Sequence, residues 1–241
     1  MLQFNDFFNA NTLNIFTDAS MNSHNTIACA GCMCVYGEVD KKLPYLHTDF
    51  KSQIWKNVTN NIGEAIAVQM GIFEALEHRN FPIIRVISDS QITIFGIRDR
   101  IFNWKESKKH PGKLVGTSDV IKNQEYFLEM LYVMLEANIP IQFVHQQGHV
   151  TFTDKSLADA EHVFVASNGI RDNVDKDLIK AISMFNNYVD RTTRKQLYET
   201  DLYMCNNIDP IRYQYMGFDK DKFYKLTHTH QFGDNRGGIP T

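Results

Sequence analysis

The amino-acid sequence predicts an α/β fold, in which helices flank a mixed five-stranded sheet and a C-terminal extension follows. One observation is the order of the elements: three strand-like runs come first, and two further strands then alternate with helical patterns. Another is composition, because 43% of the 241 residues are apolar and 22% are charged, as in globular chains with an ample core. Consecutive strands favour an antiparallel meander, and strands separated by helices make the sheet mixed.

Hydrophobic spacing defines each element in turn. The first strand contains Leu13 and Ile15, and the helical spacing that starts at Ile62 ends before Pro82. The predicted strands cover residues 13–20, 26–36, 43–51, 83–88 and 139–145, and the predicted helices cover residues 62–78, 91–100, 123–136 and 155–167. Residues 103–118 are predicted to form a basic, loop-rich excursion between two of the helices.

The chain divides into three predicted segments: a lead of residues 1–11, a main domain of residues 12–168 and an extension of residues 169–241. Gly169 favours a helix stop, a new helical pattern covers residues 177–185, and the tail from about residue 228 is predicted to be flexible. The extension also interleaves aromatic with basic residues, which can grip single-stranded nucleic acid. Burial of these rings against the main domain is the preferred interpretation. We therefore expect truncation after Gly169 to keep the candidate site but to lower solubility or stability.

Net charge and the positions of the cysteines limit the classes to which the protein can belong. The net charge of -3 and the pI of about 6.3 exclude a general nucleic-acid coat, so any such binding must come from a local patch. Cys32 and Cys34 share one face of a predicted strand while Cys29 lies on the other, which is a poor tetrahedral metal cage. Reduced core thiols are preferred for these and for Cys205. With no membrane-length apolar run and no signal peptide in the sequence, we expect a cytoplasmic monomer.

Four carboxylates lie in sequence contexts that could bring them to the same place. They are Asp18 in FTDAS, Glu64 in TNNIGE, Asp89 in SDSQ and Asp159 in SLADAE. Singly, Asp18 is explained by a turn, Glu64 by a capping box with Asn61, and Asp89 by an N-cap. Asp159 is harder to dismiss, because it shares a helical stripe with apolar residues and needs a partner there. Together, four converging acids indicate a site for hard divalent cations.

These segments, in this order, resemble those of the ribonuclease H family, type 1. FTDAS is similar to the family's first strand with its catalytic Asp, TNNIGEA to its TNN-x-x-E helix start, and SDSQ to its DSQ segment. QGH, followed ten residues after His149 by Asp159, is similar to its glycine-histidine loop and fourth carboxylate. FGIRDRIFNWK and IKN fall where the family carries a basic protrusion. The resemblance covers roughly residues 12–168.

The resemblance implies metal-dependent hydrolysis of the RNA strand in RNA–DNA hybrids. Two Mg²⁺ ions, with Mn²⁺ as a substitute, would lie roughly 4 Å apart and serve the attacking and leaving oxygens. By analogy, Asp18 bridges the ions, Asp159 helps to hold the one that activates water, and Glu64 and Asp89 hold the other. His149 on the rim assists proton handling or product departure.

The resemblance also implies a substrate-binding surface. Its expected members are Thr59 in a phosphate pocket, Asn60, Asn61 and Gln91 at the minor groove, and a basic grip formed by Trp104, Lys105, Lys108, Lys109, His110 and Lys113. The alternative interpretation of the basic patch is a solvated helix end without a binding role. One departure is Lys155, which stands near the position where many family members carry an Asn of the phosphate pocket.

Two alternatives from other classes stay open. One is a catalytically idle module that binds a hybrid or a protein partner, against which four intact carboxylates argue. The other is a different nuclease of the wider superfamily, such as a 3' exonuclease or an integrase-like enzyme. Such exonucleases begin with Asp-x-Glu, whereas here Asp18 is followed by Ala19 and Ser20, and integrases typically end with Glu rather than Asp.

Overall fold

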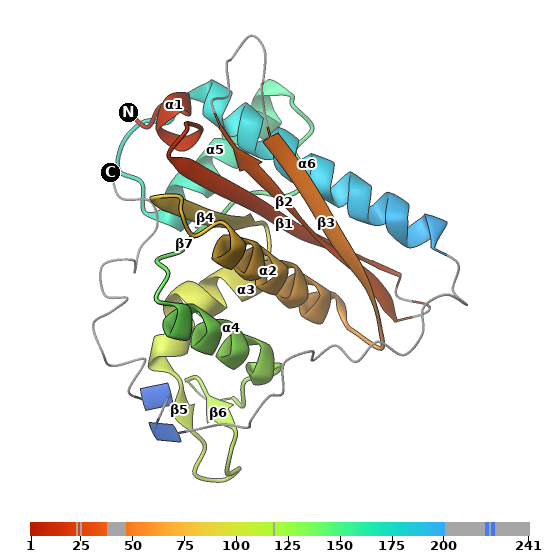
Figure 1. Cartoon of the computed structure of the whole chain (residues 1–241), viewed down its shortest axis with the longest axis vertical. Helices are drawn as coiled ribbons and strands as arrows, with labels where there is room; N and C mark the ends of the chain where they lie inside the picture. The colour runs from red at the N-terminus through yellow and green to blue at the C-terminus, as the bar shows by residue number, and fades with distance from the viewer. Residues whose placement is uncertain are drawn as a thin grey trace.

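A computed structural model of the chain places one sheet between two layers of helices (Figure 1). It describes residues 1–22, 24, 26–37, 47–117, 119–200, 220–221 and 223–224. Within these residues the main sheet has five strands in the order β3-β2-β1-β4-β7. They are β1 (Thr12–Asn22), β2 (Ile27–Tyr36), β3 (His47–Lys56), β4 (Ile83–Ser88) and β7 (Gln142–His145). β2 runs antiparallel to β1 and β3, while β4 runs parallel to β1 and β7, which confirms the mixed sheet.

The bounds of β3 and β7 differ most from the prediction, because pairing with a neighbouring strand sets them. β3 lies later than residues 43–51, since all ten residues of β2 pair with it, from Ile27 opposite Lys56 to Tyr36 opposite His47. The predicted start of this strand lies outside the described residues. β7 is shorter than residues 139–145, because β4 pairs with it only from Gln142 onward.

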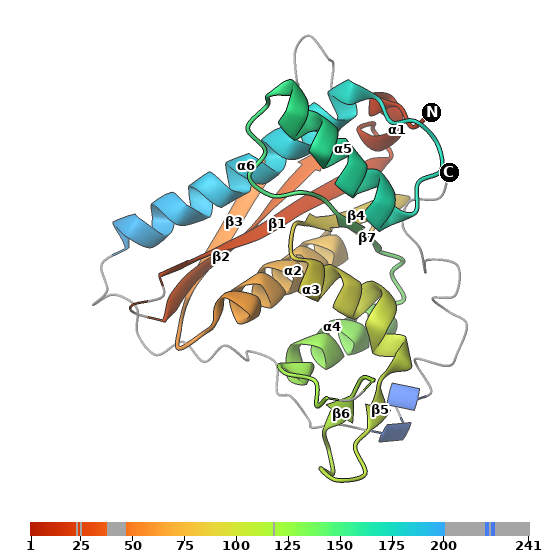
Figure 2. The ribbon, with the colours of Figure 1, turned by 180° about the vertical axis from the view of Figure 1, so that it is seen from behind.

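The helices cover both faces of the sheet (Figures 1 and 2). On one face lie α2 (Asn60–Glu77), α3 (Gln91–Phe95) and α4 (Gln124–Ala137), and on the other lie α1 (Phe4–Phe7), α5 (Asp154–Asn168) and α6 (Lys176–Glu199). Side-chain alternation along β1 explains both layers. Leu13 and Ile15 pack with Ile72 of α2, whereas Phe16 contacts Phe185 of α6 with ring centroids 5.2 Å apart.

Helix α6 is longer than the pattern over residues 177–185 predicts. The predicted stop at Gly169 is confirmed, because this residue closes α5 in the left-handed region at φ 66°. After the loop, the side chain of Asp175 caps α6 by accepting the Asp177 N–H, and the helix continues for 24 residues. Its buried side packs on β1 and β2. The extension therefore supplies α6, the longest of the three helices that cover this face (Figure 2).

The predicted excursion contains ordered structure. After α3 the chain continues through a π-helical turn, η1 (Gly96–Arg100), and a 3-10 turn, η2 (Ile101–Asn103). It then forms a short hairpin of β5 (Lys105–Glu106) and β6 (Leu114–Val115). Gly96 permits this close packing, because an added Cβ would lie 2.3 Å from the Phe127 ring of α4. Phe223 is fully buried in the same core, as the preferred interpretation of the extension rings predicts for it.

Several predictions fall outside the described residues: Cys205, most of the aromatic and basic run beyond residue 200, and the tail from about residue 228. Cys29, Cys32 and Cys34 are buried free thiols, as predicted. Of the helices in the described segments, none combines the length and the apolar character needed to cross a membrane.

Candidate active site

Three of the predicted carboxylates meet beside the parallel pair β1 and β4. Thr17 pairs with Ser88, so the next residues, Asp18 and Asp89, lie at the same level on neighbouring strands. Glu64 reaches them from the first turns of α2. One carboxylate oxygen from each acid lies within 4.8 Å of the other two. Sheet register and the start of one helix thus create the cluster.

The local explanations for these acids do not apply. The N-cap of α2 is Thr59, whose hydroxyl accepts the Ile62 N–H at 3.4 Å, so Glu64 is not needed for a capping box with Asn61. The N-cap of α3 is Ser90 rather than Asp89. Both carboxylates are thus available for another role.

Burial and mutual repulsion destabilise the charged forms of these carboxylates in the absence of cations. Asp18 and Glu64 are only 5% and 8% exposed. Burial, followed by the charges of Asp89 and Asp190, raises the pKa of Asp18 to about 8, although the Ala19 N–H donates to its Oδ1 at 2.7 Å. Burial also raises the pKa of Asp89, and burial with the Asp18 charge raises that of Glu64 well above its usual value.

The donor set fits hard divalent cations. All donors in the cluster are carboxylate oxygens, the type that Mg²⁺ and Mn²⁺ prefer. Glu64 Oε2 is buried and, among the residues that the structure describes, has no hydrogen-bond partner. A cation would satisfy this oxygen and would offset the repulsion among the acids, which adds to burial in raising their pKa values.

The fourth acid of the site is Asp190 of α6, which sequence reasoning missed. Asp190 lines a hollow of about 370 Å³ together with Asp18, Glu64, Asp89 and His149. Its side chain accepts from Arg194 Nη2 at 2.7 Å, and its charge raises the pKa values of Asp18 and Glu64. Asp190 is therefore electrostatically part of the cluster.

The structure does not bring Asp159 to this cluster, which corrects the prediction from the glycine-histidine loop. Asp159 is exposed on α5 and does not line the hollow. The physical reason is that α5 packs on the edge strand β7 and on α6, whereas α6 crosses β1, the strand that carries Asp18.

The signal for Asp190 was present in the sequence. Asn186, Asp190 and Thr193 are polar residues at helical spacing among buried apolar ones, the same pattern that drew attention to Asp159. Asn186 also stands four residues before Asp190. Lys155 stands four residues before Asp159, near the position where the family resemblance implies an Asn.

His149 lies on the rim of the hollow. Its Nδ1 is 3.5 Å from Asp190 Oδ2, while 70% of its side chain is exposed. Its backbone is in the left-handed region, with φ 54°. The preceding Gly148 allows the loop to approach the acids, because an added Cβ would meet Asp89 Oδ2 at 2.0 Å. The loop therefore holds an imidazole beside the carboxylates and leaves it open to solvent.

The remaining predicted contact residues lie around this hollow or on the hairpin. Thr59, Asn60, Asn61 and Gln91 are exposed at the starts of α2 and α3, and Asn60 lines the hollow itself. On the hairpin segment, the side chains of Lys105, Lys108, Lys109, His110 and Lys113 are all exposed. This set is free to meet a large ligand.

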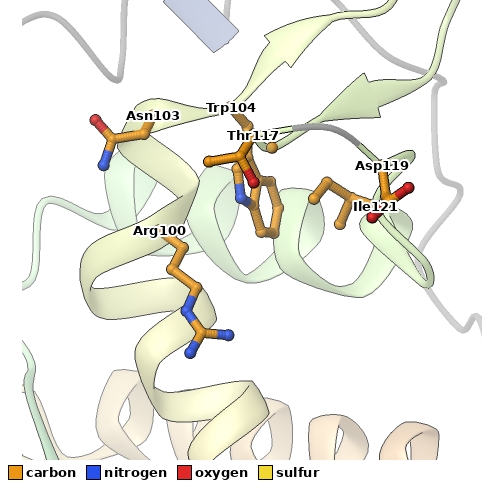
Figure 3. A pocket seen from close by; sticks show the side chains of 7 residues that line it. Arg100, Asn103, Trp104, Thr117, Asp119 and Ile121 are labelled. Atoms are coloured by element: carbon orange, nitrogen blue, oxygen red, sulfur yellow. The ribbon is translucent and has the colours of Figure 1, made fainter.

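Trp104 is the exception and needs a correction. Its side chain is only 6% exposed, and its ring meets Phe127 edge-on with centroids 5.2 Å apart. Apolar burial outweighs solvent contact for so large a ring. Trp104 also lines a second hollow of about 490 Å³. Figure 3 shows Arg100 and Asn103 on one side of the Trp104 ring, and Asp119 and Ile121 on the other. Trp104 thus anchors the hairpin rather than presenting a face for stacking.

Comparison with known proteins identifies the family. The family model for RNase H matches residues 10–167. Among solved structures, the chain is similar to LC11-RNase H1, isolated from compost by a metagenomic approach, with 18% identity and a TM-score of 0.40 over 64% of this chain and 92% of that one. It is also similar to LC9-RNase H1, a type 1 RNase H with the type 2 active-site motif, with 12% identity and a TM-score of 0.46 over 95% and 86% of the two chains.

A further similar structure is LC11-RNase H1 in complex with an RNA/DNA hybrid, with 20% identity and a TM-score of 0.36 over 56% of this chain and 85% of that one. No curated protein sequence matches the chain significantly. The family model, by contrast, spans well over half of the 241 residues. The chain therefore belongs to the RNase H family and is a ribonuclease H enzyme.

Proposed function

We propose that the enzyme hydrolyses the RNA strand of RNA–DNA hybrids with the help of two divalent cations held by Asp18, Glu64, Asp89 and Asp190. The observation that carries this proposal is the convergence of four carboxylates on one hollow, with the pKa of Asp18 raised to about 8 by burial and by its acidic neighbours. When bound, Mg²⁺, or Mn²⁺ in its place, supplies an activated water and stabilises the leaving oxygen.

The positions of the acids support different roles for them in holding the two cations. Asp18 takes the shared position, because the charges of both Asp89 and Asp190 act on it from different elements. Asp190, rather than Asp159, pairs with Asp18 on the side of α6. Glu64 and Asp89 form the other side, where α2 and the end of β4 meet.

His149 handles protons at the rim. An imidazole can accept and donate a proton near neutral pH, which suits the departure of the product strand. Its contact with Asp190 at 3.5 Å keeps the ring close to the carboxylates, and its exposure lets it exchange protons with water.

Substrate contacts surround the hollow. Asn60, Asn61 and Gln91 present exposed side-chain amides that can meet the minor groove, where the 2'-hydroxyl distinguishes RNA from DNA. Thr59 faces a phosphate of the DNA strand, while the hairpin lysines add sequence-independent attraction to the phosphate backbone.

The test is incubation with labelled RNA–DNA hybrid, duplex RNA and single strands, with and without Mg²⁺. We expect cleavage of the RNA strand of the hybrid alone, and only with the cation. Asp18→Asn should abolish cleavage and retain hybrid binding, because the substitution removes charge while keeping shape. Hybrid binding without cleavage by the unmodified enzyme would instead support a catalytically idle binding module.

A further inference from the structure

A second cluster of metal-ligating side chains lies near the other end of α2. Glu74 and His78 are one helical turn apart there, and Cys34 faces them from β2. One ligand atom from each lies within 4.8 Å of the other two, and Cys34 Sγ is 4.0 Å from Glu74 Oε2. With a rise of about 1.5 Å per residue, Glu74 is about 15 Å along the helix from Glu64. This cluster is therefore distinct from the carboxylate hollow.

The chemistry of this cluster differs from that of the hollow. It offers a thiol, an imidazole and a carboxylate, the donors that zinc takes, whereas the hollow offers oxygen alone. Cys32 lies on the same face of β2 as Cys34, but its thiol is not among the ligand atoms that lie within 4.8 Å of one another. The cluster therefore offers three protein ligands, which leave the fourth position of a tetrahedral site to water.

We propose that Cys34, Glu74 and His78 form a zinc site that ties α2 to β2. The cysteines of β2 alone make a poor metal site. The packing of α2 on β2 adds Glu74 and His78 as ligands. Cys34 and Glu74 are buried, while His78 is half-buried, so the cluster is reached from solvent on the His78 side.

Lys51 competes with the metal for Glu74. Its Nζ lies 2.7 Å from both carboxylate oxygens, and it must move before a cation can bind. Its side chain is 49% exposed, and Asp49 Oδ2, at 3.9 Å, offers it another partner.

The experiment titrates the reduced, full-length protein with Co²⁺, which reports thiolate ligation by charge-transfer absorption. We expect this band in the unmodified protein and in Asp18→Asn, because the carboxylate hollow holds no thiol. Cys34→Ser and His78→Ala should each weaken Co²⁺ binding by more than about 100-fold, beyond the 10–100-fold typical of outer-shell changes. Lys51→Met should strengthen binding up to about fivefold, as the loss of an exposed ion pair predicts.

Cys29→Ser is the matched control, because Cys29 is also buried on β2 but faces Gln196 of α6, with its Sγ 3.7 Å from Oε1. It should leave the band and the affinity unchanged. If Cys34→Ser fails to fold, the half-buried His78→Ala decides the question. No charge-transfer band at saturating Co²⁺, or a band lost in Cys29→Ser but kept in Cys34→Ser and His78→Ala, would overturn the site. Neither result bears on cleavage of hybrids.

Discussion

Helices α5 and α6 both follow β7, and both carry an Asp at helical spacing among apolar residues, but only one of these acids reaches the carboxylate hollow. Asp159 of α5 is exposed, whereas Asp190 of α6 is 9% exposed and lines the hollow. The difference follows from which helix crosses β1. A short distance along the chain from the glycine-histidine loop does not by itself decide which acid joins the site.

The packing of the two helices explains this difference. α6 buries apolar side chains against β1 and β2 along most of its length. α5 is instead fastened to the edge strand through Asn168, whose Nδ2 donates to the His145 carbonyl at 2.7 Å and whose Oδ1 accepts the His145 N–H at 3.0 Å. The longer amphipathic helix, α6, packs on β1 and β2 and so places Asp190 at the carboxylate hollow.

Truncation after Gly169 should produce the largest effect. The fragment would lose α6 and expose the sheet face formed by Phe16, Met33 and Val35, so we expect little soluble, cooperatively folding protein and no cleavage. This replaces the expectation that such a fragment keeps its site. Soluble yield, thermal unfolding and hybrid cleavage measure it. A stable, active fragment would show that α5 carries the fourth acid after all.

Asp190→Asn and Asp159→Asn form a matched pair. Asp190→Asn should lower the cleavage rate by at least about 100-fold, since changes to partners of metal ligands alone cost 10–100-fold. Asp159→Asn should leave the rate within about twofold, because its exposed side chain does not line the hollow. Single-turnover cleavage of one hybrid by both variants gives the answer. The reverse order of effects would contradict the assignment.

The pH dependence of stability should also separate the two acids. The Asp18 carboxyl has a folded-state pKa of about 8 against its usual 3.8, so the folded state binds the proton more tightly than the unfolded state. Without metal, the free energy of unfolding should therefore fall as pH rises from about 4 to about 8. Asp190→Asn should reduce this slope, because the Asp190 charge raises the Asp18 pKa, and Asp159→Asn should not.

Denaturant unfolding in a chelating buffer at several pH values measures this slope. Added Mg²⁺ should restore stability most at the higher pH, where the carboxylates are free to bind it. A slope that is equal in the unmodified protein and in Asp190→Asn would mean that the two charges do not interact.

The smallest expected effect concerns the hairpin. Joint neutralisation of Lys108, Lys109 and Lys113 should flatten the salt dependence of hybrid affinity by up to about 0.9 in log–log slope for each lost phosphate contact. Lys180→Gln is the control, because this lysine is also exposed but belongs to α6 and has no assigned substrate contact. Equal slopes in the two variants would indicate that the hairpin lysines are merely solvated.

The sequence by itself determined the sheet, most helices and three acids of the site. Periodicity locates β1, β4 and α2, because their buried faces must be apolar at spacings of two or 3.6 residues. Asp18 lies on β1 beside the end of β4, where Asp89 follows, and Glu64 lies in the first turns of α2, so local pattern is enough to place them together. The basic character of residues 103–118 is also a local property, whereas the burial of Trp104 depends on Phe127 of α4.

Only the tertiary structure decided the fourth acid and the second cluster of ligands. Asp159 and Asp190 have similar local patterns, and the choice between them rests on which helix buries more apolar surface against β1 and β2. Cys34 is 40 residues from Glu74 in the chain, and their meeting depends on the packing of α2 against β2. Contacts between residues so far apart are set by the packing of whole elements, because no local spacing encodes which of two amphipathic faces will meet.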